Sequence, residues 1–133
     1  MMPKAAVLLR ACAAVCGLAA WAAAATAELC GRPREAPEAL YERLTKTEKL
    51  PVTSREKGYV TVNDAAKETL WTFTLAGHPA HPSVVCRRPV KEGDKVRIEM
   101  GVQCGAAEKE CDRLLRAFRD LNQKKPNDAG EAK

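Results

Sequence analysis

Residues 95–121 decide the fold: KVRIEMGVQC (95–104) is followed by GAAEKEC (105–111) and DRLLRAFRDL (112–121). In the first block every second residue is apolar, namely Val96, Ile98, Met100, Val102 and Cys104. Side chains alternate between the two faces of a strand, so the block predicts a strand whose apolar face is turned to the core. Apolar residues then recur at helical spacing, at Ala107, Cys111, Leu114, Leu115, Phe118 and Leu121, which predicts an amphipathic helix.

Two cysteines lie where this strand ends and this helix begins. Cys104 belongs to the apolar face of the strand and Cys111 to the apolar stripe of the helix, so both face the same interior. We expect them to form a disulfide, which for so short a loop stabilises the fold by roughly 2–3 kcal/mol. Free thiols and a metal-binding pair are the alternatives, although six intervening residues exceed the two to four of zinc knuckles.

The first 27 residues have the organisation of a secretory signal peptide. Lys4 and Arg10 provide positive charge, an apolar run covers residues 11–22, and Ala25-Thr26-Ala27 matches a cleavage site. We expect Sec-type export with cleavage near Ala27, a periplasmic or secreted mature chain, and no stable membrane insertion after cleavage. A retained anchor and a lipid-modified cysteine are the alternatives; the apolar run is short for a membrane span.

Loss of residues 1–27 changes both the cysteine count and the charge. Cys12 and Cys16 leave, so four of the six cysteines remain, and pairing of Cys104 with Cys111 leaves Cys30 for Cys86. An oxidising compartment favours both disulfides. Two basic residues and no acid leave with the signal, which reduces the net charge from +5 to +3. This small excess indicates no particular partner.

The remaining sequence predicts one domain of the α+β class, over residues 28–125. A short helix is expected over 38–49, a loop over 50–57, and further strands over 59–62, 70–75 and 83–90. Pro89 cannot donate a ladder hydrogen bond, which indicates a sheet edge near it. The predicted architecture is a small antiparallel sheet of three to four strands with the C-terminal helix on one face. Residues 126–133 are polar and are expected to form a disordered tail.

The best candidate for a functional feature is the segment His78-Pro79-Ala80-His81-Pro82, which contains the only two histidines of the chain. One interpretation is a rigid structural turn, because the prolines of the segment restrict the backbone. A second interpretation is a contact with a ligand or partner. A third alternative is a metal site or metal sensor that uses His78 and His81, for which two histidines alone are a weak ligand set.

Three further residues are possible ligand or partner contacts. Trp71 could line a binding groove, but with Phe73 and Leu75 on the same strand face it fits the core. Arg113 and Arg116 lie opposite the apolar stripe of the last helix, where they are either a solvated face or a contact for an anionic envelope polymer or acidic partner. The small excess charge argues against nucleic acid.

The sequence contains none of the common catalytic motifs, such as G-x-S-x-G, H-E-x-x-H or C-x-x-C. An oxidised Cys86 cannot act as a nucleophile beside His78 or His81. We therefore expect no catalytic residues, no enzyme activity and no cofactor. The oligomeric state cannot be read from the sequence.

The segments Trp71-Thr-Phe-Thr, His78-Pro-Ala-His-Pro82, Cys104-Gly and Cys111-Asp resemble small exported proteins of Gram-negative bacteria, a group without an assigned activity. The resemblance covers residues 58–121 and leaves Cys30 outside. It implies a single domain in the cell envelope. We expect a non-catalytic periplasmic or secreted binding or accessory protein whose partner is an envelope protein or polymer; metal binding by His78 and His81 is the alternative.

Overall fold

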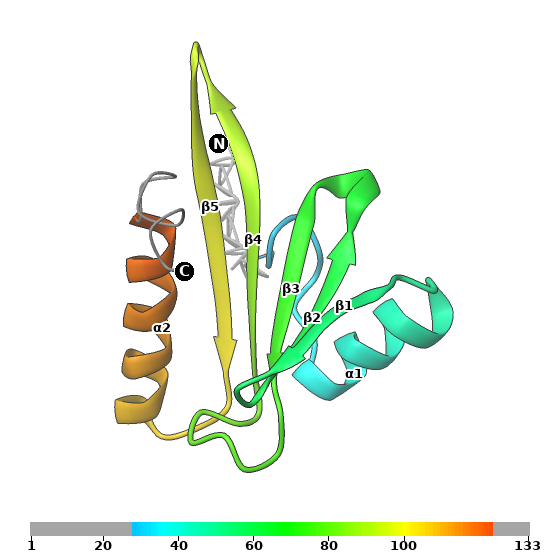
Figure 1. Cartoon of the computed structure of the whole chain (residues 1–133), viewed down its shortest axis with the longest axis vertical. Helices are drawn as coiled ribbons and strands as arrows, with labels where there is room; N and C mark the ends of the chain where they lie inside the picture. The colour runs from blue at the N-terminus through cyan, green and yellow to red at the C-terminus, as the bar shows by residue number, and fades with distance from the viewer. Residues whose placement is uncertain (1–27, 124–133) are drawn as a thin grey trace, which may run out of the picture.

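The computed structural model describes residues 28–123 as one antiparallel sheet with a helical layer on each face. The five strands follow one another in the order β1-β2-β3-β4-β5 (Figure 1). The elements are α1 (Pro37–Glu42), η1 (Arg43–Thr47), β1 (Val52–Glu56), β2 (Tyr59–Asp64), η2 (Ala65–Lys67), β3 (Thr69–Thr74), β4 (Ser83–Glu92), β5 (Lys95–Cys104) and α2 (Glu108–Gln123). The predicted α+β class is confirmed, whereas the sheet has five strands instead of three to four.

Helix α2 covers one sheet face, as the pattern of residues 95–121 predicts. Leu114 and Phe118 are buried there with Val85, and Met100 and Val102 pack against them. The disulfide between Cys104 and Cys111 joins the end of β5 to the first turn of α2 and is confirmed. The acidic residues of that turn, Glu108 and Glu110, are favourable at a helix N-terminus.

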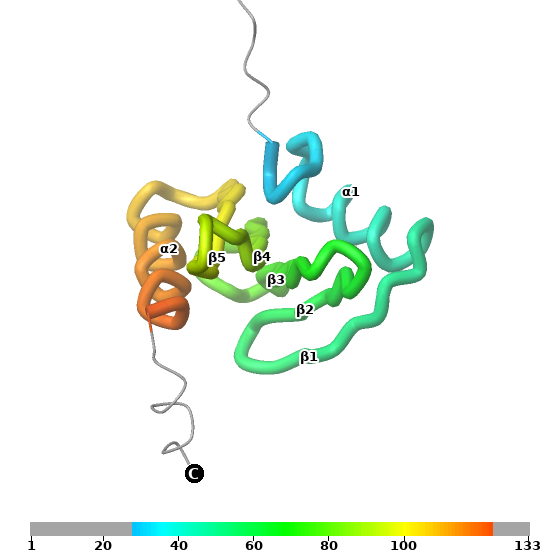
Figure 2. The backbone as a smooth tube through the Cα atoms, turned by 90° about the horizontal axis from the view of Figure 1, so that it is seen from above, coloured from blue at the N-terminus to red at the C-terminus, as the bar shows by residue number. Residues whose placement is uncertain are grey.

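The segment before α1, together with α1 and η1, covers the other sheet face. Figure 2 shows α1 and α2 on opposite sides of the strands. The largest buried cluster forms here around Trp71 and Phe73, and it contains the predicted disulfide between Cys30 and Cys86. Leu75 packs against the same cluster, so the predicted apolar face of β3 is confirmed. Two disulfides fit an extracellular or periplasmic protein, because such bonds persist in oxidising compartments.

Strand β1 contradicts the loop that the sequence predicts over residues 50–57, where Pro51 lies. The strand pairs with β2 and is interrupted by an irregularity between Val52 and Ser54. Four of its five residues are exposed, so it lacks the apolar alternation on which strand prediction depends. It is an edge strand of the sheet, and its backbone pairing with β2 compensates for the poor pattern.

The apolar alternation of β5 continues beyond the region that the fold buries. Val96 is 61% exposed and Ile98 is 45% exposed, so the expectation that the whole face turns inward is wrong for these two residues. The β4–β5 hairpin projects beyond the other strands and beyond α2 (Figure 1). Strand β3 pairs with β4 only as far as Arg87, which leaves Pro89 unpaired on that side, in agreement with the predicted edge.

Candidate functional site

The loop between β3 and β4 sends its two histidines to different faces of the sheet. On the α2 side, the ring of His78 lies 4.7 Å from that of Tyr59, centroid to centroid. The Ala80 N–H donates to His78 Nδ1 at 3.0 Å, so Nδ1 is an acceptor and Nε2 carries the proton of the neutral ring. That Nε2 lies 2.9 Å from the Tyr59 hydroxyl oxygen. His78 therefore holds Tyr59 in place.

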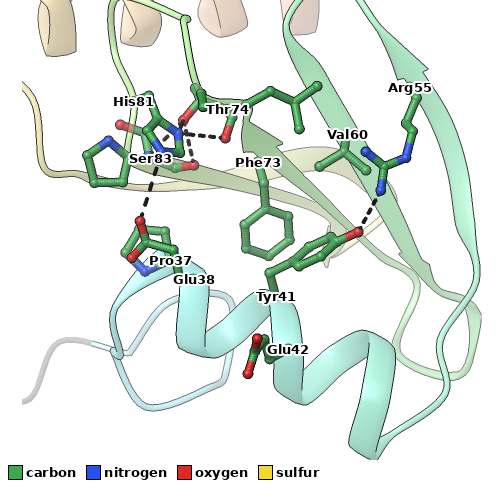
Figure 3. Close-up of a pocket in the computed structure, with 13 residues that line it drawn as sticks. Pro37, Glu38, Tyr41, Glu42, Arg55, Val60, Phe73, Thr74, His81 and Ser83 are labelled. Carbon is green, nitrogen blue, oxygen red and sulfur yellow. Dashed lines mark hydrogen bonds and ion pairs between the residues drawn. The ribbon is translucent and has the colours of Figure 1, made fainter.

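His81 lies on the α1 side and lines a pocket of about 260 Å³ (Figure 3). Its Nδ1 is 2.9 Å from the carbonyl oxygen of Thr74, which can only accept, so Nδ1 donates. Glu38 Oε1 is 3.9 Å from Nε2 of His81. Tyr41 stands edge-on to Phe73 across the pocket and accepts a hydrogen bond from Arg55 at 3.0 Å. This pocket is small for a ligand site.

A larger hollow, of about 590 Å³, lies on the α2 side of the sheet. We call it the α2 groove. Its wall on the helix side comes from Ala117, Phe118, Asp120 and Leu121. Its other lining residues come from strands β1 to β4 and from the turn after β1, at Ser54, Glu56, Lys57, Tyr59, Thr61, Thr72 and Arg87. The groove exists because α2 packs toward β4 and β5, which leaves this face of β1, β2 and β3 without a helix above it.

Arg87 is the most distinctive residue of the α2 groove. Its guanidinium carbon lies 5.4 Å from the centroid of the Phe118 ring. Its Nε is buried without a hydrogen-bond partner, and Nη1 makes one long contact, 3.5 Å, with the Asn122 side-chain oxygen. Within residues 28–123 no carboxylate forms an ion pair with Arg87. The structure thus holds a partly desolvated cation whose hydrogen-bonding capacity is largely unused.

Burial affects the ionisation of both Arg87 and Tyr59. Desolvation lowers the pKa of the Arg87 guanidinium, which nevertheless keeps its charge at neutral pH. Desolvation also raises the pKa of the Tyr59 phenol above its usual value, so the hydroxyl stays neutral and remains a hydrogen-bond donor and acceptor. The groove therefore offers one half-buried positive charge, neutral hydroxyls and an aromatic wall. Such a set suits the binding of an anion more than covalent chemistry.

The other predicted contact residues lie outside the α2 groove. Trp71 is 1% exposed and belongs to the core of the opposite face, where Arg32 lies over its ring at 5.8 Å. Arg113 and Arg116 are exposed on α2, and Arg113 pairs with Glu110 three residues earlier. The described residues contain no group of three or more potential metal ligands, and both ring nitrogens of His78 already have partners. The metal-binding alternative stays a prediction.

The sequence analysis places Arg87 and Tyr59 in the expected strands 83–90 and 59–62 and assigns neither residue to a site. Their association depends on Phe118, which is distant from both in the sequence and lies 5.7 Å from the Tyr59 ring, centroid to centroid. The alternation of side chains along β4 could have pointed to Arg87. It places Arg87 on the same face as Val85, among residues that α2 covers. An arginine at a position expected to be buried is unusual without a paired acid.

Among the helices of the described chain, none is long and apolar enough to span a membrane. Comparison with known proteins gives no relative: no family model, no curated protein and no solved structure matches the chain.

Proposed function

We propose that this chain is an exported, non-catalytic binding protein of the cell envelope that receives an acidic group of its partner in the α2 groove. The observation that supports this proposal is Arg87, a half-buried guanidinium that stacks near Phe118 and has no acidic partner within the described chain. Charge-assisted hydrogen bonds are stronger than neutral ones, and more so where water is partly excluded. A carboxylate or phosphate is the chemical group that satisfies such a site.

The surroundings of Arg87 support recognition of a group that is partly apolar. Phe118 and Tyr59 provide an aromatic wall, and the hydroxyls of Thr61 and Thr72, 3.2 Å apart, provide polar contacts on the floor. Lys57 adds positive charge at the rim, whereas Glu56 and Asp120 limit how much negative charge the groove accepts. An acidic group attached to a ring or a short apolar stem fits this combination better than a highly charged polymer.

The groups that commonly perform catalysis are used structurally around the groove. The two nitrogens of His78 position Tyr59 and the Ala80 N–H, and all four cysteines between residues 28 and 123 are in disulfides. This use supports a binding role. Both disulfides, together with the secretory character of residues 1–27, support a place outside the cytoplasm.

The proposal is tested by NMR titration of the oxidised protein with benzoate, inorganic phosphate and benzyl alcohol. We expect saturable shifts of the Arg87 Nε–H and of Tyr59 and Phe118 with an anion, and none with the uncharged alcohol. Arg87→Met should weaken binding about ten-fold or more, because it removes a charge-assisted hydrogen bond. Arg116→Gln, which removes an exposed arginine of α2 outside the groove, is the matched control and should bind like the wild type. Absence of any anion-dependent shift at Arg87 would refute the proposal.

A further inference from the structure

We infer that the protein forms a symmetric dimer in which the free edge of β5 pairs antiparallel with β5 of a second copy, with Ile98 on the two-fold axis. This inference does not depend on the α2 groove, because none of the β5 residues that it uses lines that groove. Three features of β5 support it: an open edge, an exposed apolar face and a self-complementary sequence.

Within residues 28–123, the edge of β5 is open where the hairpin projects. The strand is last in the sheet order, and every residue from Lys95 to Ile98 is exposed. Helix α2 ends beside Met100, where the Asn122 amide nitrogen lies 3.4 Å from the methionine sulfur, so the first residues of β5 lie beyond the helix (Figure 1). A long edge strand with exposed apolar side chains is the usual template for pairing with another chain.

The backbone groups of the even-numbered residues of β5 point to this edge. Pro89 is the partner of Ile98 and has no N–H, so the two form a pair without ladder hydrogen bonds. The N–H and C=O of Ile98 therefore point away from β4, and by alternation so do those of Val96, Met100 and Val102. The contact of Arg34 Nη1 with the carbonyl oxygen of Val102, at 3.2 Å, agrees with this direction.

Two-fold pairing about Ile98 makes the cross-strand pairs between Val96 and Met100 favourable. On the apolar face, Ile98 meets its own copy and Val96 meets Met100 of the second copy. On the other face, Arg97 meets Glu99 of the second copy. Each charge also has an acid or base of its own chain beside it, since Arg88 pairs with Glu99 at 2.6 Å and Glu92 pairs with Arg97. The dimer would extend these pairs into rows of alternating charge.

The neighbouring registers are less favourable, because they place like charges opposite each other or require a backbone group that is already hydrogen-bonded. Moving the axis to Arg97 or Glu99 places two like charges directly opposite each other, which is destabilising. Moving it to Met100 places Ile98 opposite Val102, whose outward carbonyl is occupied by Arg34. The register centred on Ile98 keeps the hydrogen bond from Arg34 to the Val102 carbonyl oxygen. It uses only the backbone groups of Val96, Ile98 and Met100. Self-complementarity of this kind indicates a second copy of the chain as the occupant of the edge.

Sedimentation equilibrium of the oxidised protein over a range of concentrations tests the dimer. We expect a monomer–dimer equilibrium in the wild type and a monomer for Ile98→Glu. Val52→Glu is the matched control, because Val52 is 41% exposed on β1, the other edge strand, and it should dimerise like the wild type. A wild-type protein that stays monomeric, or equal loss of dimer in both variants, would overturn the inference.

The register is tested by charge reversal. Arg97→Glu and Glu99→Arg each place like charges opposite each other at two symmetric positions, and each should weaken the dimer about ten-fold. The double variant Arg97→Glu/Glu99→Arg restores opposite charges across the axis and should recover most of the affinity. If it dimerises no better than the single variants, the proposed register is wrong.

Discussion

The hydroxyl oxygen of Tyr59 lies 2.9 Å from Nε2 of His78, and the same phenol ring stands edge-on to Phe118 at 5.7 Å. Three segments that are far apart in the sequence, the start of β2, the loop before β4 and the middle of α2, thus meet at one tyrosine. Because Tyr59 and Phe118 both line the α2 groove, the ionisation of Tyr59 reports on whether this part of the groove is formed as described.

Tyr59 should ionise at a higher pH than an ordinary tyrosine, because burial raises the pKa of its phenol above 10. The folded protein then holds this proton more tightly than the unfolded chain does. The stability that depends on the neutral phenol is present below about pH 10 and is lost as the pH rises through the folded-state pKa. Ultraviolet absorbance of tyrosinate in a Tyr41→Phe variant, which retains only Tyr59, measures this ionisation.

Phe118→Ala provides the control for that titration. It removes the ring that covers Tyr59 and should move the ionisation back toward the ordinary value of about 10. If Tyr59 in the Tyr41→Phe protein already ionises at that value, the phenol is solvated, and the described packing of Phe118 against Tyr59 is incorrect.

The two disulfides should contribute unequally to stability. Cys30 and Cys86 are separated by 56 residues and Cys104 and Cys111 by 7. Loop-closure entropy therefore predicts that loss of the first pair costs about 4 kcal/mol and loss of the second about 2.5 kcal/mol. Chemical unfolding of Cys30→Ala/Cys86→Ala and Cys104→Ala/Cys111→Ala tests this order. A larger loss in the second variant would contradict it.

Gly101→Ala should destabilise the protein although both residues are small. A Cβ at this position would lie 2.8 Å from Leu29 Cδ1 and 2.9 Å from Cys86 Sγ, closer than real contacts allow. The sulfur is fixed by its disulfide, so the cost should be about 1–3 kcal/mol in the free energy of unfolding. In a Leu29→Ala background the added methyl has room, and the same substitution should cost less. Equal costs in the two backgrounds would show that Leu29 does not crowd Gly101.

The parts of the fold that the sequence predicted are those in which the signal is local. The strand of residues 95–104, helix α2 and the disulfide between Cys104 and Cys111 follow from periodicities within 27 consecutive residues. The second disulfide followed from counting the remaining cysteines. Strand β1 was missed because an edge strand needs no apolar face, and nothing in residues 52–56 distinguishes it from a loop.

The candidate site was predicted less well, because its geometry depends on distant residues. The segment of His78 and His81 was interpreted as a rigid turn, a ligand contact or a metal site, and in the structure each histidine hydrogen-bonds on a different face of the sheet. Arg87 is a candidate anion-binding residue because it lies near Phe118 and has no paired acid in the described structure. A strand pattern shows neither property. Similarly, the alternation that predicted β5 does not reveal that α2 is too short to cover Val96 and Ile98.

Glu48 should make the protein more stable at neutral pH than in acid. Arg32 donates two hydrogen bonds to its carboxylate, at 2.6 and 2.7 Å, and these lower the pKa of Glu48 below 4.5. Above about pH 4.5 the carboxylate is ionised in both states and the stabilisation is complete. As the pH falls further, the unfolded chain takes up the proton first, and the stabilisation is lost as the pH falls through the folded-state pKa.

Glu48→Gln should therefore lower the free energy of unfolding by about 1 kcal/mol at pH 7, because the carboxylate is partly exposed, and by little at pH 3. Arg32 also contacts Asp64 at 3.3 Å and lies over Trp71, so it stays fixed in the variant and the comparison isolates the carboxylate. Glu42→Gln, which removes the acid of an exposed pair with Lys46, is the matched control and should change stability by about zero at either pH. Urea unfolding at the two pH values measures both variants, and an equal acid-dependent loss in Glu48→Gln and the wild type would contradict the role assigned to Glu48.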